Sequence, residues 1–173
     1  AVGLLVAPAT RGQQRDLPAI VQPERPTREA FMRRALEMRR ISVERGDQAY
    51  GAVIVKDGRI VGEGISAVVT ANDPTAHPEL ALARWAAAHL PADERLAATV
   101  YTSGEHCPMC AAAISFARIR RLYFGAGDPK GGAVENGVRL YASPTCHHAP
   151  EVYGGLRESE AGDLLRAFFK SRR

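Results

Sequence analysis

The fold of this chain is decided by TSGEHCPMC at residues 102–110, together with HPE at residues 77–79. Cys107 and Cys110 are separated by two residues, so at the start of a helix both sulfurs can face one point, because positions i and i+3 share a helix face. His77 offers a third ligand atom. Three protein ligands leave one corner of a tetrahedral zinc ion open, which is typical of catalytic rather than structural sites. The sequence therefore predicts a catalytic Zn²⁺ site.

The cysteines also permit other interpretations. Three cysteines cannot form a closed set of disulfides. A redox pair at Cys107 and Cys110 is the alternative to a metal site, but it would leave His77 and Glu79 without a task. Two buried thiols beside a loop histidine are the remaining structural explanation. Cys146 is interpreted as a loop thiol, with a second metal site as the alternative.

Length and composition indicate one globular domain. The chain has 173 residues, of which 46% are hydrophobic and 24% charged, and this balance does not favour disorder. The net charge is +4, and the basic residues are scattered. Such an excess is compatible with a polyanionic partner but does not require one.

Residues 1–25 are predicted to lie outside the domain, which we place at residues 26–173. Residues 1–8 are an apolar run, residues 7–10 resemble a small-residue cleavage site, and a polar linker follows. The segment is therefore either the remnant of an export signal, which would place the protein in the periplasm or outside the cell, or a floppy extension. It is too short to span a membrane, and we expect no membrane association of the domain.

The first half of the domain predicts a helix, a hairpin and a second helix. Thr27 is the expected N-cap of the first helix, whose apolar face carries Phe31, Ala35 and Met38. The arginine pairs at 33–34 and 39–40 should point away from that face. The remaining expected elements are strands at 50–55 and 60–64 joined by Asp57-Gly58, a loop at 66–76, and a helix from Pro78 to Leu90.

The second half predicts strands alternating with helices. Strands are expected at 97–102, 121–126 and 151–153, and helices at 107–118 and 159–170. Together with the hairpin, these segments predict an α/β fold, a three-layer α/β/α arrangement with a mixed five-stranded sheet.

The predicted metal site suits the displacement of an amino group from an aromatic ring. Zinc with an open corner lowers the pKa of bound water to about 7 and so supplies hydroxide, the expected nucleophile. The reaction also needs a group that takes a proton from this water and returns it to the ring and to the departing amine. Glu79 is the expected proton shuttle, because a carboxylate near the metal but not bound to it can do both.

These motifs resemble the signature of the zinc-dependent cytidine deaminase-like superfamily. Residues 51–58, 72–77 and 102–103 are similar to bacterial guanine deaminases, whereas 118–121, 124–126 and 164–169 look more like tRNA adenosine deaminases. The resemblance covers roughly residues 27–172. It implies a zinc-dependent hydrolytic deaminase with His77, Cys107 and Cys110 as ligands, a cytoplasmic location, and a homodimer formed through the helices that follow the metal motifs.

The resemblance also places Ser66, Ala76 and His106 against the substrate. Two of these depart from the family pattern. His106 stands where the family usually has proline, and Ser66 where guanine and tRNA enzymes typically carry an asparagine that reads the base edge. Because serine lacks the amide fork, we expect a different ring, such as a pyrimidine, pterin or triazine-like heterocycle.

Three functions follow from these residues. The leading expectation is a hydrolytic deaminase of a free nucleobase or related amino-substituted heterocycle, guanine-deaminase-like, with a small molecule as its partner. The alternative is a tRNA adenosine deaminase, for which Phe168, Phe169 and the basic tail at 172–173 would bind single strands, although packing of both rings in the core of the last helix is the favoured interpretation. From another class, a non-catalytic zinc-binding module would have no use for Glu79.

Overall fold

The computed structural model describes residue 17 and residues 19–171, so the expected export-signal remnant at 1–10 and the tail at 172–173 lie outside the described residues. The helices are α1 (Arg28–Glu44), α2 (Pro78–His89), α3 (Ala92–Arg95), α4 (Pro108–Ala117) and α5 (Glu158–Lys170), with a 3-10 turn η1 (Leu140–Ala142). The strands are β1 (Gly51–Lys56), β2 (Arg59–Ile65), β3 (Thr99–Gly104), β4 (Arg121–Ala126) and β5 (Glu151–Tyr153).

The five strands form one mixed sheet in the order β2-β1-β3-β4-β5. β1 is antiparallel to both β2 and β3, whereas β3, β4 and β5 run parallel. The β1–β2 hairpin turns at Asp57 and Gly58, whose φ angles are both positive, 50° and 70°. A two-residue turn of this kind matches the twist of the strands that it joins. The mixed sheet predicted from the sequence is thus confirmed.

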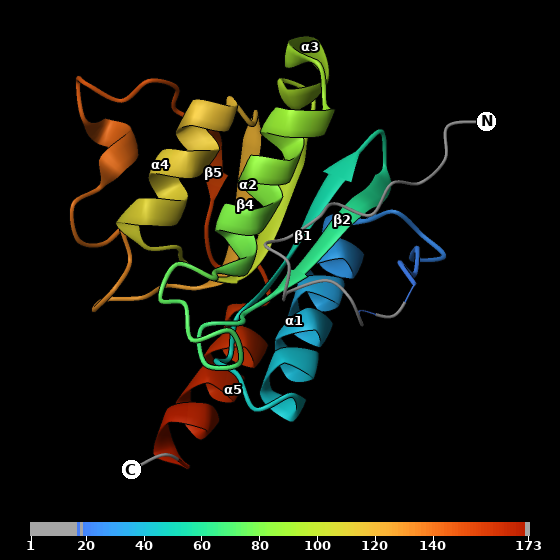
Figure 1. Ribbon diagram of the computed structural model, residues 1–173, viewed down its shortest axis with the longest axis vertical. Coiled ribbons are helices and arrows are strands. Elements are labelled where there is room, and N and C mark those ends of the chain that lie inside the picture. The colour runs from blue at the N-terminus through green and yellow to red at the C-terminus, as the bar shows by residue number, and fades with distance from the viewer. Residues whose placement is uncertain (1–16, 18, 172–173) are drawn as a thin grey trace.

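Helices cover both faces of the sheet, which confirms the three-layer prediction (Figure 1). One apolar cluster joins α2 and α4 to the sheet through residues such as Leu82, Ile114 and Leu122. The other joins α1 and α5 to the opposite face, with Met32 and Tyr123 among its members. Alternate residues of each strand enter the two clusters, because successive side chains of a strand point to opposite faces.

Helix α1 begins as predicted but does not expose all of its arginines. Thr27 is the N-cap, and its hydroxyl oxygen accepts a hydrogen bond from the N–H of Ala30 at 3.2 Å. Arg39 was expected to point away from the core, yet only 2% of it is exposed. Its Nη1 donates to the carbonyl oxygen of Ala161 at 2.8 Å. The expectation was wrong because α5 packs over this side of α1 and brings the carbonyl group of Ala161 within reach of the guanidinium group.

Helix α5 packs on the sheet only near its beginning. Ala161 and Gly162 are its buried residues. Phe169 is 49% exposed, so the interpretation of this ring as core of the last helix was wrong, and Leu164 is 48% exposed. The reason is position, since the later turns of α5 extend beyond the strands in Figure 1 and have no layer to pack against.

The segment before α1 contacts the edge of the sheet. The side-chain amide of Gln22 donates to the carbonyl oxygen of Ile60 at 2.7 Å and accepts from its N–H at 2.8 Å. The domain boundary at residue 26 stays a prediction. Within the described residues, no helix has the length and apolar character that crossing a membrane requires.

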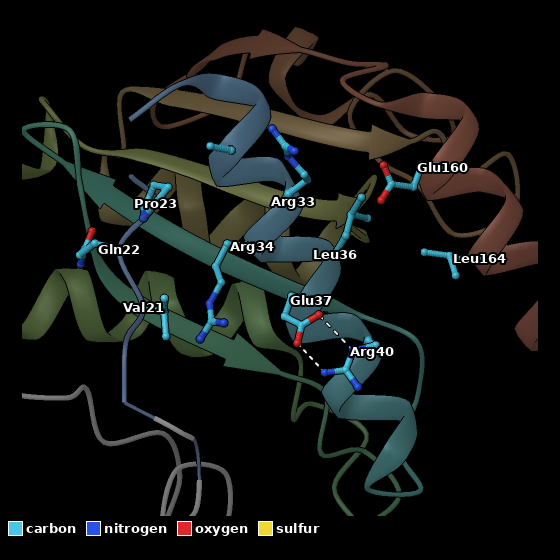
Figure 2. A pocket seen from close by; sticks show the side chains of 11 residues that line it. Val21, Gln22, Pro23, Arg33, Arg34, Leu36, Glu37, Arg40, Glu160 and Leu164 are labelled. Carbon is cyan, nitrogen blue, oxygen red and sulfur yellow. Dashed lines mark hydrogen bonds and ion pairs between the residues drawn. The ribbon is translucent and has the colours of Figure 1, made fainter. Parts of the chain in front are cut away.

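A hollow of about 470 Å³ lies over the outer face of α1, between residues 21–23 and the side of α5 that carries Glu160 (Figure 2). Glu37 pairs with Arg40 there, and Arg34 pairs with Glu63. Most of the charge in the hollow is therefore balanced, and none of the site residues predicted from the sequence lines it.

Candidate active site

The predicted site residues gather where β3 ends and α2 and α4 begin. Pro78 and Pro108 stand in the first turns of these two helices, where their missing N–H groups leave no unpaired donor. Gly64 of β2 allows α2 to approach, because a Cβ atom there would lie 3.1 Å from Pro78. As α2 also packs against α4, their N-termini and the residues just before them share one edge of the sheet.

His77, Cys107 and Cys110 form one cluster. Their ligand atoms all lie within 4.8 Å of one another. Nδ1 of His77 is 3.7 Å from Sγ of Cys107 and 3.6 Å from Sγ of Cys110. Two atoms bound to one tetrahedral zinc ion, at about 2.1 Å for nitrogen and 2.3 Å for sulfur, are separated by about 3.5 Å. The donor set and its spacing therefore fit zinc and leave one coordination position to a non-protein ligand.

Helix α4 stabilises a negative charge on Cys107. The pKa of Cys107 is lowered to about 3, first by a hydrogen bond from the thiol of Cys110 and also by His77 and the backbone N–H of Cys110. The pKa of Cys110 is raised, because its thiol donates a hydrogen bond to Cys107 and is buried. Because zinc binds thiolates, the lowered pKa of Cys107 favours metal binding at this cluster.

Glu79 lies beside the cluster in a dry environment. It is 3% exposed, and its Oε2 lies 3.8 Å from Sγ of Cys110. Burial raises the pKa of Glu79 to about 7. A carboxyl group with such a pKa can both accept and donate a proton near neutral pH, as expected of a proton shuttle.

His106 is buried at the turn before Cys107. It is 2% exposed, and neither ring nitrogen has a hydrogen-bond partner among the described residues. Burial lowers the pKa of His106 to about 4, which leaves the ring neutral. Ala76 is also buried, and its carbonyl oxygen accepts from the N–H of Ala67 at 3.0 Å. Substrate contacts by His106 and Ala76 remain predictions.

Ser66 has its hydroxyl group engaged elsewhere. It donates to Oδ1 of Asp47 at 2.6 Å, and both residues are buried. Asp47 also accepts from the N–H groups of Gln48, Val69 and Thr70 and from the hydroxyl of Thr70. Ser66 thus has no hydrogen left to donate to a substrate, and its role as a substrate contact remains a prediction.

Tyr50 is a residue near the site that sequence reasoning did not single out. Burial, together with the charges of Asp128, Glu79 and Cys107, raises the pKa of Tyr50 to about 12. The ring therefore lies within electrostatic reach of three groups at this edge. The sequence shows Tyr50 only as the start of a strand, and nothing there indicated that Asp128 would come close.

Glu105 was likewise missed. It is 3% exposed and accepts hydrogen bonds from residues 128 and 134–136. Although burial acts in the opposite direction, these bonds lower the pKa of Glu105 and keep it charged. The carboxylate thus joins the turn before Cys107 to the loop after β4.

A large cleft lies between that loop and α5. Its volume is about 1040 Å³. Cationic and aromatic side chains line it, namely Lys130, Arg166, Phe169 and Lys170, together with the acidic Asp128 and Glu158. The volume of the cleft matches the upper limit of the range for small-molecule sites, about 300–1,000 Å³. The cleft is open to solvent along α5.

Comparisons with known proteins agree with this site. A family model described as the cytidine and deoxycytidylate deaminase zinc-binding region matches residues 25–126. The tRNA-specific adenosine deaminase of Agrobacterium fabrum is 52% identical over 143 residues, which are 83% of this chain and 94% of that protein. That of Bacillus subtilis is 34% identical over 145 residues, 84% of this chain and 90% of that protein.

Solved structures show the same pattern. One, from studies of A-to-I editing by tRNA:A34 deaminases at the wobble position of transfer RNA, is 54% identical with a TM-score of 0.74, covering 80% of this chain and 100% of its own. A guanine deaminase from Bacillus subtilis is 41% identical with a TM-score of 0.53, covering 58% of this chain and 65% of its own.

Proposed function

The chain belongs to the cytidine and deoxycytidylate deaminase zinc-binding family, and from this membership we propose that it deaminates adenosine in transfer RNA to inosine. It is a zinc-dependent deaminase, a hydrolase of C–N bonds. The proposal concerns its substrate, which we infer to be an adenosine at the wobble position of a tRNA anticodon.

The open cleft along α5 is the observation that carries this proposal. A free base needs an enclosed pocket, whereas an RNA loop needs a groove with cations for phosphates and exposed rings for stacking. Phe169 is 49% exposed on the wall of the cleft, where Lys130 and Lys170 also lie. Its exposure removes the core-packing explanation of this ring and leaves it available for an unpaired base.

The expectation of a free nucleobase or small heterocycle as substrate and partner is wrong. Relatives at 52% and 34% identity, matched over most of both chains, are tRNA-specific adenosine deaminases. The guanine deaminase matches only 58% of this chain. The residue at position 66 does not identify the ring that is deaminated, because the hydroxyl of Ser66 donates its hydrogen to Asp47.

The geometry suggests a division of tasks within the site. His77, Cys107 and Cys110 would hold the ion, which when bound lowers the pKa of a water molecule to about 7. Glu79 would take one proton from the attacking water and pass it to the ring nitrogen of adenine. It would then take the second proton from the hydroxyl group added to the ring and give it to the amino group, which departs as ammonia while the C=O bond of inosine forms. Because Glu79 is 3% exposed, bulk water does not compete for these protons.

We also infer that the protein acts as a homodimer through the end of α4. Phe116 and Val138 are 71% and 68% exposed, and the ring of Phe116 stacks on His147 with centroids 5.2 Å apart. These residues border a hollow of about 300 Å³ that Leu140 also lines. A projecting ring beside a hollow on the same surface suits a two-fold interface, in which the ring of each copy enters the hollow of the other copy.

The proposed substrate can be tested by measuring inosine in RNA. The zinc-loaded protein should convert adenosine to inosine in an anticodon stem-loop with adenosine at the wobble position, and should release no ammonia from free adenosine or guanine under the same conditions. The same stem-loop with a wobble guanosine is the control. Equal rates on free guanine and on the RNA would contradict the proposal.

Binding gives a second test. If phosphates are neutralised in the cleft, affinity for the stem-loop should fall steeply between 50 and 200 mM salt, by about tenfold or more for a few contacts. An affinity that does not change with salt would argue against RNA as the substrate.

A further inference from the structure

The carboxylate of Glu105 is the centre of the loop that follows β4, residues 127–136. Oε1 accepts hydrogen bonds from the backbone N–H groups of three consecutive residues. Oε2 accepts one hydrogen bond from a backbone N–H group and one from a side-chain amide. The donors to Oε1 are the N–H groups of Val134, Glu135 and Asn136, at 3.0, 2.7 and 2.8 Å. Those to Oε2 are the N–H of Asp128 at 2.9 Å and Nδ2 of Asn136 at 2.5 Å.

The loop is also shaped to fit around this side chain. A Cβ atom on Gly132 would lie only 2.5 Å from Cδ of Glu105, so the backbone passes as close as glycine allows. The N–H of the next residue, Ala133, donates to the carbonyl oxygen of His106 at 3.0 Å. The loop is therefore attached to the two residues that immediately precede Cys107.

The other end of the loop forms part of the cleft. Asp128, Pro129 and Lys130 line one wall, opposite α5. Asp128 is also within electrostatic reach of Tyr50, which in turn is near Glu79. A displacement of the loop would therefore change the cleft without touching the cysteines.

We propose that Glu105 is a positioning residue, whose carboxylate holds residues 127–136 against the zinc-ligand turn so that the loop presents a fixed wall to the RNA. This inference rests on the proposed function, because the wall borders the proposed RNA cleft. The loop has no regular secondary structure of its own between β4 and η1, and ordering such a segment costs conformational entropy. Hydrogen bonds from N–H groups to a charged acceptor offset that cost better than neutral ones.

Glu105→Gln tests the proposal with little change in shape. The side-chain amide of glutamine can accept hydrogen bonds only on its oxygen. Its NH₂ group would face a backbone N–H group, and because both are donors the hydrogen bond there would be lost. In hydrogen exchange of the zinc-loaded full chain, the amides of residues 134–136 should exchange at least about tenfold faster, as a lost local restraint implies. Glu105→Asp, which keeps the charge but is shorter, should restore part of the protection.

Glu135→Gln is the matched control. Its side chain is exposed, and no hydrogen bond of that side chain is found among the described residues, while its backbone N–H still bonds to Glu105. It should exchange like the unchanged protein. Asn136→Ala removes one donor to Oε2 and is the milder variant to use if Glu105→Gln does not fold.

Kinetics separates positioning from a general loss of structure. For Glu105→Gln, KM for the stem-loop should rise about tenfold while kcat per bound zinc stays within about twofold, since the lost interaction serves binding rather than chemistry. The zinc content should stay at one ion per chain. A merely unstable variant would instead show a lower active fraction with an unchanged KM.

Each alternative result has a defined meaning. Unchanged exchange at residues 134–136, loss of zinc, or a fall in kcat at constant KM would overturn the role of Glu105. If the unaltered protein makes no inosine from the stem-loop, the proposed function fails, and the exchange measurement still decides whether Glu105 holds the loop.

Discussion

Ser66 donates its hydroxyl hydrogen to Oδ1 of Asp47 across 2.6 Å, at a point where both side chains are buried. Asp47 lies in the loop between α1 and β1, and Ser66 follows β2 directly. The bond thus ties two segments beside the loop that leads to His77. Asp47 and Glu105 both have a buried carboxylate that accepts hydrogen bonds from several backbone N–H groups.

Removing the Ser66 hydroxyl should destabilise the protein. Ser66→Ala takes one donor from a buried carboxylate, so the free energy of unfolding in urea should fall by about 1–3 kcal/mol. Ser159→Ala, at an exposed position, should change it by less than about 0.5 kcal/mol. Equal stabilities of the two variants would show that Asp47 does not depend on Ser66.

The pKa of Asp47 predicts how this stabilisation depends on pH. Although burial acts to raise it, hydrogen bonds from Ser66 and Thr70 lower the pKa of Asp47 below its ordinary value of 3.8. The stabilisation is therefore present above pH 3.8 and is lost as the pH falls through the lower pKa of the folded state. The stability difference between the unchanged protein and Asp47→Asn, followed by urea unfolding, should shrink on acidification below pH 3.8. A difference that grows with acidity would contradict this sign.

The assignment of the zinc ligands predicts metal loss for two substitutions and none for a third. His77→Ala and Cys110→Ala should each weaken zinc binding by more than about 100-fold, since even groups that only support a ligand are worth 10- to 100-fold. Cys146→Ala is the matched control. Its sulfur lies 3.4 Å from the hydroxyl of Ser115 rather than at the cluster, so one zinc per chain should remain by elemental analysis. Loss of zinc from Cys146→Ala would mean that the cluster has been misassigned.

Glu79→Gln should separate metal binding from catalysis. The variant keeps the size of the side chain but cannot carry a proton, so inosine formation should slow by about 10²- to 10⁴-fold while the zinc content stays constant. Glu135→Gln, at an exposed position, should react at the unchanged rate. Full activity of Glu79→Gln would exclude this carboxyl group as the proton shuttle.

The proposed dimer predicts a change of mass on altering one exposed ring. Phe116→Glu places a charge in the interface, so light scattering should detect a monomer at concentrations where the unchanged protein is a dimer. Phe116 is 71% exposed in a single chain. Its replacement should therefore change the free energy of unfolding of the monomer in urea by less than about 0.5 kcal/mol, as is usual for a surface substitution. A mass equal to that of the unchanged protein would place the interface elsewhere.

Much of the fold follows from local patterns. Asp57-Gly58 predicted a tight hairpin, and Thr27 and Pro78 predicted the starts of two helices. The alternation of strands with helices predicted a mixed sheet with helices on both faces. The short helix α3 and the turn η1 were not predicted, because each is a single turn with no periodic apolar face. The same limit explains Arg39, whose charge suggested solvent while the packing of α5 buried it.

The sequence by itself indicated the chemistry: a pair of cysteines at a helix start and a histidine followed by a glutamate predicted a catalytic zinc site, and their resemblance to a known family indicated a deaminase. Each of the two motifs is short, so local sequence is enough to show it. Only the tertiary structure decided what surrounds that chemistry. It turned Ser66 toward Asp47, wound residues 127–136 around Glu105 and left Phe169 exposed on an open cleft. These outcomes depend on contacts between segments far apart in the chain, whose orientation no local pattern encodes.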